Sequence, residues 1–190
     1  MKKNYFILTI GAILVIIFGF MQLIYQVGPT EVVIRTTLGK ADGRQYMKGF
    51  HFRFPWPIDQ IYKFDKRIQS FESTFEETST TEGKPILVKV FVTWKINNAL
   101  KFLNSFSGDM ANADVVLQGM VRSAQNAVIG KYAFNNLVST NEEELKLDAI
   151  EAEMKKRVGE NSEFYGIEII MVGIKLPGKT GDELEAEGKQ

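Results

Sequence analysis

The sequence predicts an α+β fold, in which one N-terminal membrane-spanning helix precedes a domain of helices packed against an antiparallel-leaning sheet. Three observations lead to this prediction. Residues 5–25 are uncharged and mostly apolar, the following residues to 96 alternate in the way strands do, and the remainder combines helical periodicity with a last strand.

The N-terminal apolar segment, residues 5–25, begins and ends with tyrosine and has only Thr9 and Gln22 as clearly polar side chains. About 20 such residues cross the ~30 Å hydrocarbon core of a bilayer as one helix. Two lysines precede the segment, so the positive-inside rule places residues 1–4 in the cytoplasm and the rest of the chain on the exported side. A cleaved signal peptide is the alternative, but this apolar run is too long for one and no small-residue cleavage site follows it.

Composition removes several classes of function. Lysine plus arginine (23) balances aspartate plus glutamate (23), which argues against a nucleic-acid partner. The chain has no cysteine, and His51 is its only histidine, so thiol chemistry and a shared histidine metal site are excluded. Two carboxylate pairs could be read as acid and base, but turns and solvation explain them better: Asp59 with Asp65, and Glu76 with Glu77. We therefore expect a protein that is not an enzyme, with no catalytic residues, metal or cofactor.

Strands are predicted from two-residue alternation of apolar and polar side chains. In residues 31–38, Val32, Ile34 and Leu38 fall on the buried side, and a glycine-containing turn follows. Residues 61–71 continue as a candidate paired strand. The strongest strand lies near residue 90, and its inward side chains are Ile86, Val88, Val90, Val92, Trp94 and Ile96.

The stretch GFHFRFPWPID gathers aromatic side chains at the end of a strand. Its alternation places Phe50, Phe52 and Phe54 on one face, which we expect to be the core, and His51 on the outer face. The two prolines that flank Trp56 end the ladder, because proline has no N–H to donate. Trp56 either packs at the domain edge or lies at the level of lipid headgroups, where indole rings are favoured, and it is the candidate membrane-interface residue.

Helices follow. The stretch NALKFLNSF predicts a short helix capped by Asn98, and ADVVLQGMVRSAQNAVIG predicts a longer one that ends at Gly130. A third helix is predicted to begin at STNEEELKL, with a capping box formed by Ser139 and Glu142 or by Thr140 and Glu143. Its apolar stripe is Leu147, Ile150, Met154 and Val158, and its surface pairs are Glu142–Lys146, Glu151–Lys155 and Glu153–Arg157.

The last strand is predicted over YGIEIIMVGIKLP, and a polar tail covers residues 178–190. Gly173 to Thr180 formally match the phosphate-binding pattern G-x-x-x-x-G-K-[ST]. A phosphate-binding loop must open a helix in a parallel sheet, and that context is missing. Nucleotide binding by this loop is therefore the weakest of the functional alternatives.

Several pieces stand in a characteristic order: the apolar segment, PTEVVIRTTLGK, KGFHFRFPWPID, YKFDKRIQSF, VFVTWKI and YGIEIIMVGIKLP, over residues 5–177. In this order the chain resembles the stomatin/prohibitin/flotillin family, also called the SPFH or Band 7 family, and most of all its HflC-like branch. The resemblance implies an SPFH domain over residues 28–177. Family members usually continue past this domain into a long helical segment. Here thirteen residues follow Pro177, so we expect a shortened member or a fragment, for which cage assembly is open.

The resemblance also implies a function. Relatives of this kind are membrane scaffolds that oligomerise with an HflK-like paralogue and modulate an FtsH-type ATP-dependent membrane protease. It implies location in the bacterial inner membrane, with membrane lipid as a further partner. The alternative is a stomatin-like organiser of membrane microdomains with another client. The sequence names neither the client nor the stoichiometry nor the residues that contact a partner.

Overall fold

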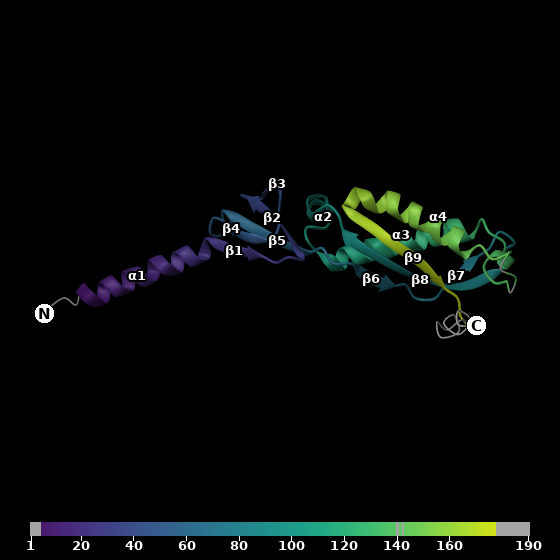
Figure 1. Cartoon of the computed structure of the whole chain (residues 1–190). Coiled ribbons are helices and arrows are strands. Elements are labelled where there is room, and N and C mark those ends of the chain that lie inside the picture. The colour runs from purple at the N-terminus through teal and green to yellow at the C-terminus, as the bar shows by residue number, and fades with distance from the viewer. Residues whose placement is uncertain (1–4, 140, 142, 178–190) are drawn as a thin grey trace, which may run out of the picture. The chain divides into compact units, whose positions relative to one another are not determined.

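The computed structural model describes residues 5–139, 141 and 143–177 (Figure 1). The chain divides into two compact units, unit 1 over residues 1–66 and unit 2 over residues 67–190. Among the described residues, no helix combines the length and the apolarity that crossing a membrane requires.

Unit 1 contains one helix and five strands within its described residues. They are α1 (Tyr5–Gln22), β1 (Ile24–Val27), β2 (Glu31–Thr37), β3 (Lys40–Tyr46), β4 (Gly49–Phe52) and β5 (Asp59–Asp65). The strands form an antiparallel sheet in the order β3-β2-β5 and an antiparallel pair of β1 with β4.

The core of unit 1 is small. Tyr25, Val27 and Val33 form its buried cluster, with Tyr46 and Ile61 packed against it. The predicted burial of Val32 and Ile34 in β2 is confirmed. The predicted burial of Leu38 is wrong, because Leu38 lies in the turn between β2 and β3 with a φ of 51° and is 77% exposed.

Unit 2 is a sheet covered by helices. Its strands are β6 (Gln69–Glu72), β7 (Glu76–Ser79), β8 (Pro85–Ile96) and β9 (Ile167–Lys175), and its α-helices are α2 (Ala99–Phe106), α3 (Met110–Ile129) and α4 (Leu147–Ser162). β8 is the centre, since β6 and β7 pair with its two halves along one edge and β9 pairs along the other. All these pairings are antiparallel, as predicted.

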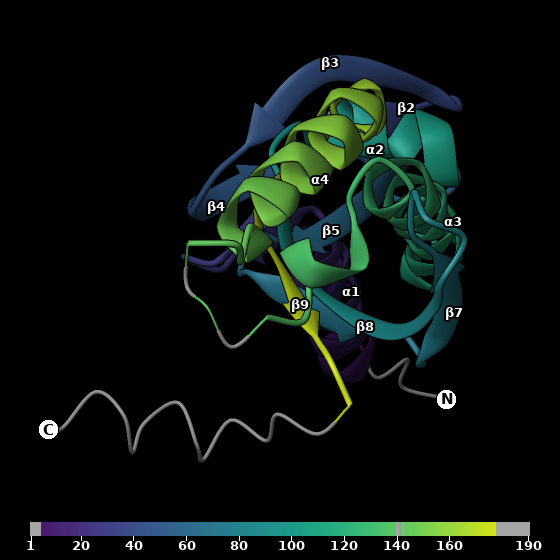
Figure 2. The same cartoon turned by 90° about the vertical axis from the view of Figure 1, so that its right-hand side faces the viewer.

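One face of β8 forms the core of unit 2. The six side chains that the alternation placed on it, from Ile86 to Ile96, are all buried. Figure 2 shows α3 and α4 on the same side of β8 and β9. The helices contribute a matching buried stripe, which is Leu117, Val121, Ala124 and Val128 from α3 and Ile150, Met154 and Val158 from α4.

The ends of the helices confirm one prediction and correct another. Asn98 caps α2 as predicted, and its side chain accepts hydrogen bonds from two backbone N–H groups of the first turn. However, α4 begins at Leu147, not near residue 139. Ser139 instead accepts a hydrogen bond from the backbone N–H of Asn141. Thr140 and Glu142 lie outside the described residues. The two predicted capping boxes and the predicted pair of Glu142 with Lys146 each include one of these residues, so they lie outside the described part of the chain as well.

Two acidic residues of α4 form contacts outside their helix. Glu151 accepts a hydrogen bond from the backbone N–H of Ile174 in β9, at 2.8 Å. Glu153 forms an ion pair with Lys131 and accepts a hydrogen bond from the Tyr132 hydroxyl. These acidic side chains therefore connect α4 to its neighbours, whereas the sequence predicted pairs within the helix surface.

Gly166 makes the tight turn into β9. Its φ is 77°, and its carbonyl oxygen accepts hydrogen bonds from the backbone N–H groups of Asn97 and Asn98. A Cβ at this position would lie 2.2 Å from the Asn98 carbonyl oxygen. Only glycine satisfies both the left-handed backbone and this close approach.

Candidate functional site

A row of large apolar side chains is exposed on unit 1. We call Phe50, Phe52, Phe54 and Trp56 the aromatic surface, and their side chains are 73%, 71%, 61% and 76% exposed. Several large apolar side chains left exposed within one short segment are typical of a site of contact with another molecule or with a membrane. The aromatic surface is therefore the candidate functional site.

The predicted alternation along this stretch is correct, but the predicted face is wrong. Phe50 and Phe52 point outward, and His51 is the half-buried residue. The His51 ring lies 5.6 Å from the Tyr25 ring and 5.2 Å from the Tyr46 ring, measured between centroids. Its Nε2 lies 2.8 Å from the Met47 carbonyl oxygen. The interior of this small sheet offers aromatic and polar neighbours, which suit an imidazole better than a stack of phenyl rings.

The aromatic surface lies beside the residues that directly follow α1. The backbone N–H of Arg53 donates to the Leu23 carbonyl oxygen at 2.8 Å. In the pairing of β1 with β4, Ile24 lies opposite Phe52, and Ile24 is itself exposed. The C-terminal end of α1 and the aromatic surface are therefore neighbours through backbone hydrogen bonds, although Leu23 and Phe52 are far apart in sequence.

A second exposed apolar turn is hydrogen-bonded to the end of this stretch. The backbone N–H of Leu38 donates to the Ile58 carbonyl oxygen at 2.8 Å. Both side chains are exposed, Leu38 at 77% and Ile58 at 40%. This neighbour could not be predicted from the sequence, because Leu38 fits the buried side of an alternating strand.

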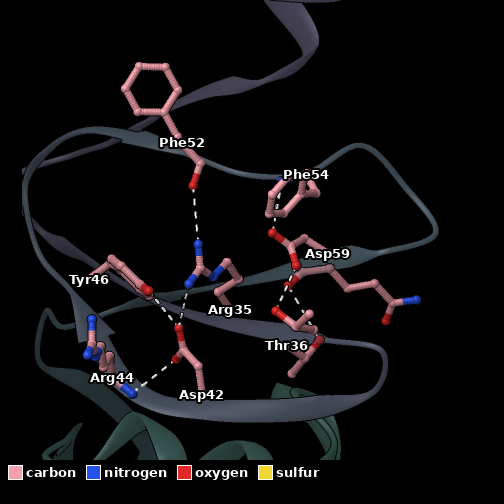
Figure 3. A network of polar contacts seen from close by, with 10 residues as sticks. Arg35, Thr36, Asp42, Arg44, Tyr46, Phe52, Phe54 and Asp59 are labelled. Carbon is pink, nitrogen blue, oxygen red and sulfur yellow. Dashed lines mark hydrogen bonds and ion pairs between the residues drawn. The ribbon is translucent and has the colours of Figure 1, made fainter.

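A network of polar contacts lies behind the aromatic surface, and Figure 3 shows it from close by. The Arg35 guanidinium donates to Asp42 at 3.1 Å and to the Phe52 carbonyl oxygen at 3.4 Å. Asp42 also accepts from the Tyr46 hydroxyl at 2.6 Å and from the Arg44 backbone N–H at 3.0 Å. In the same view the Phe52 ring points away from the network.

Asp59 is the second centre of this network. It is 2% exposed. One of its carboxylate oxygens accepts from the Thr37 hydroxyl at 2.7 Å, and the other accepts from the Phe54 backbone N–H at 2.8 Å. Turn chemistry and solvation were the predicted explanation of Asp59, and no pattern in the sequence signals the contact with Phe54.

Both aspartates have lowered pKa values. Burial by itself would raise the pKa of Asp59, but the hydrogen bonds from Phe54 and Thr37 and the charge of Arg35 lower it below its ordinary value. Burial likewise opposes the lowered pKa of Asp42, and the hydrogen bonds from Tyr46, Arg44 and Arg35 outweigh it. Both groups are carboxylates at neutral pH, and each accepts hydrogen bonds from fixed donors.

Each carboxylate of the network accepts hydrogen bonds from donors of the protein at both of its oxygens. Among the described residues, no group of three or more histidine, cysteine, aspartate or glutamate side chains is placed to hold a metal ion. Glu76 and Glu77 are the second carboxylate pair considered from the sequence. Glu76 lies in unit 2 and forms an ion pair with Arg122.

The formal phosphate-binding pattern begins inside a strand. Gly173 lies in β9 opposite Phe91, and a Cβ there would come within 2.0 Å of the Phe91 ring. This glycine therefore provides room for an aromatic ring across the strand pair. The remaining motif residues, Gly178 to Thr180, lie outside the described part of the chain.

Comparison with known proteins identifies the family pattern. The SPFH domain / Band 7 family matches residues 25–180. Among curated proteins, HflC of Haemophilus influenzae is 32% identical over 131 residues, which are 68% of this chain and 43% of that protein. The modulator of FtsH protease HflC of Escherichia coli K12 is 26% identical over 108 residues, which are 56% of this chain and 32% of that protein.

A third relative extends over more of the chain. Protein HflC of Buchnera aphidicola subsp. Schizaphis graminum is 22% identical over 198 residues, which are 95% of this chain and 64% of that protein. The chain thus spans between 32% and 64% of the lengths of these three relatives.

Proposed function

The chain belongs to the SPFH domain / Band 7 family, and from this we propose that it is an HflC-like membrane scaffold. In this proposal it oligomerises with an HflK-like paralogue and modulates an FtsH-type membrane protease. Support comes from the family match and from distant relatives, one of which is named as a modulator of FtsH protease. The chain acts by binding and is not an enzyme.

Membrane attachment is the part of the proposal that the geometry supports best. In our proposal residues 5–25 anchor the chain, residues 1–4 stay in the cytoplasm, and the SPFH domain of residues 28–177 lies on the exported side of the bacterial inner membrane. The segment of α1 carries no charged residue. The described side chains of residues 10 and 13–17 in this helix are all exposed apolar groups, which are favourable in lipid and costly in water.

The observation that carries this proposal is the aromatic surface beside the end of α1. Phe52 lies opposite Ile24, just after α1, so in our proposal a helix that ends at the membrane surface brings Phe52 to the level of the headgroups, and Trp56 follows four residues later. Indole and phenyl rings are favoured at that level. The aromatic surface thereby becomes the contact between lipid and the domain that follows the anchor.

The topology can be tested because the chain has no cysteine. Single cysteines are introduced as Lys3→Cys and, on the exposed side of α4, as Lys155→Cys. A membrane-impermeant maleimide added to intact spheroplasts is expected to label position 155 and to leave position 3 unlabelled until the membrane is opened. The reverse pattern would contradict the proposed orientation, and release of the chain by alkaline carbonate would contradict the anchor.

The scaffold function is tested by the mass of the complex extracted from membranes in a mild detergent, with its co-purifying proteins identified. A large species that contains an HflK-like paralogue and an FtsH-type protease is the expected result. A monomer or dimer without the protease would contradict it.

The alternative is a stomatin-like organiser of membrane microdomains with another client. The aromatic surface favours this alternative as much as it favours the scaffold, because a lipid contact requires no protease. An oligomer that is free of the protease and bound to a different protein would support it.

A further inference from the structure

We propose that Asp59, assisted by Arg35, is a positioning residue that holds the aromatic surface with its rings outward. This inference rests on the proposed membrane contact of that surface. In this inference Asp59 and Arg35 fix the backbone of the aromatic surface and do not contact the lipid themselves.

The need for such a residue follows from where β4 ends. The ladder stops at Phe52, and residues 53–58 lie outside regular strands. Pro55 and Pro57 have no backbone N–H, so neither can donate to a neighbouring strand. The Phe54 N–H has also left the ladder, and its acceptor is the Asp59 carboxylate at 2.8 Å. A side chain therefore replaces a strand as the partner of this peptide group.

Asp59 is itself fixed on both sides. It is the first residue of β5, where it lies opposite Thr37 of β2, and the Thr37 hydroxyl donates to its second oxygen at 2.7 Å. The side chain is nearly inaccessible to solvent. Both carboxylate oxygens thus have a donor at short distance, and the carboxylate holds Phe54 in a defined place relative to two strands.

Arg35 acts at the preceding peptide group but more weakly. Its guanidinium donates to the Phe52 carbonyl oxygen at 3.4 Å, which is at the long end for a hydrogen bond, whereas the contact of Asp59 with Phe54 is short. Asp42 and the Tyr46 ring hold the guanidinium, the ring centroid lying 5.2 Å away. We therefore assign the larger share of the positioning to Asp59.

Positioning matters because the rings of the aromatic surface have little protein packing of their own. With more than half of each side chain exposed, few protein contacts hold the rings, and the course of the backbone sets the side of the segment from which each ring projects. A segment held in its binding conformation loses less conformational entropy when it binds. The buried carboxylate thus preorganises the backbone that carries these rings.

The test uses the full chain reconstituted into phosphatidylcholine and phosphatidylglycerol vesicles in which part of the lipid carries bromine on its acyl chains. Bromine quenches a tryptophan that reaches the bilayer. Trp56 is exposed, whereas Trp94, the other tryptophan of the chain, is buried in unit 2. The test variant is Asp59→Asn, which keeps the size of the side chain but offers one acceptor oxygen to two donors.

Tyr46→Phe is the matched control. It removes the 2.6 Å hydrogen bond to Asp42 from the same network and leaves Phe54 untouched. We expect wild type and Tyr46→Phe to be quenched alike, and Asp59→Asn to lose about threefold to tenfold in bromine quenching. Amide exchange at Phe54 is expected to speed up in Asp59→Asn alone.

A second variant covers the case in which Asp59→Asn does not fold, as judged by exchange in β2 and β5. Thr37→Val keeps the carboxylate but releases its second contact, and we expect it to lower quenching by a smaller factor in the same direction. If wild type is quenched and both Asp59→Asn and Thr37→Val are quenched to the same extent, the positioning role is overturned. The membrane contact would then still stand. Absence of quenching in wild type would overturn the membrane contact and, with it, this inference.

Discussion

Asp42 and Asp59 make the stability of unit 1 dependent on pH. Their pKa values are lowered in the folded chain, so the folded state binds fewer protons than the unfolded state just below the ordinary aspartate pKa of about 3.9. The stabilisation is therefore complete above that value and is lost as the pH falls through the lowered pKa values. Acid should release the network before it affects the apolar core.

We predict that Asp42→Asn lowers the free energy of unfolding of unit 1 by about 1 to 2 kcal/mol at pH 7, since Tyr46, Arg44 and Arg35 lose a charged acceptor. The variant should also lose less stability than wild type as the pH falls from about 4 through the lowered pKa values. The free energy of opening of β2 and β5, measured by amide exchange at several pH values, checks both. Parallel curves for the two proteins would show that Asp42 does not contribute to the acid sensitivity.

Leu38 shows how a local turn changes the environment of a single residue. The alternating pattern of β2 assigned it to the core, but Leu38 and Gly39 both have positive φ and form the turn into β3. An alternating pattern gives the period of a strand but not the residue at which the strand stops. A leucine in the left-handed region is also strained, by roughly 1 kcal/mol.

We predict that Leu38→Asn stabilises unit 1 by about 0.5 to 1 kcal/mol relative to Leu38→Ala, because asparagine tolerates the left-handed backbone and alanine does not. Both variants remove the exposed apolar side chain, so the comparison isolates the backbone effect. Denaturant unfolding measures the difference. Equal stability of the two variants would argue against strain at this turn.

At the scale of elements, long and strongly periodic segments were predictable and the direction of a short strand was not. β8 alternates over twelve residues, and one of its faces is buried throughout. The alternation of apolar and polar side chains was therefore enough to predict which face of β8 meets the core. β4 has four residues, and apolar side chains on one face do not decide whether that face meets protein or lipid. The alternation of β4 therefore predicted its period correctly, but Phe50 and Phe52 lie on the exposed face and not in the core.

The start of α4 was missed for a related reason. The segment after Ser139 contains acidic residues at capping-box spacing, but Ser139 and Asn141 use their side chains in local turns. The helix then begins at Leu147, where the apolar stripe starts. Contacts between residues distant in sequence, such as Thr37 with Asp59, leave no trace in periodicity and appear only in the fold.

The strand pair of β8 and β9 depends on one small residue. Gly173 lies under the Phe91 ring, and the Lys175 ammonium lies 5.8 Å from the centre of that ring. We predict that Gly173→Ala displaces the ring and lowers the stability of unit 2 by about 1 kcal/mol. In combination with Phe91→Ala the cost should fall, giving a coupling energy of about 0.5 to 2 kcal/mol in a double-mutant cycle. Additive effects would mean that the two residues do not share this space.

At the scale of the whole molecule, the two units provide separate reporters of stability. The backbone amides of β2 and β5 report on unit 1 through hydrogen exchange, and Trp94, which is buried in the core of unit 2, reports on that unit through its emission. Each unit has its own core, and regions with separate cores can unfold as separate cooperative units. The family match covers parts of both units.

We predict that variants confined to one unit change only the transition of that unit. Gly166→Ala, which places a Cβ against the Asn98 carbonyl oxygen, should lower the transition followed by Trp94 emission and leave amide exchange in β2 and β5 unchanged. Asp59→Asn should do the opposite. A shift of both transitions by either variant would show that the two units unfold together.

The contact of Glu151 with Ile174 has a consequence for aggregation. β9 is the last strand along its edge of the described sheet, and strands in that place can template the growth of fibrils through their unpaired peptide groups. Glu151 already accepts the N–H of Ile174 and brings a carboxylate to that edge. A carboxylate carried by the protein's own helix thus protects this edge against edge-to-edge stacking.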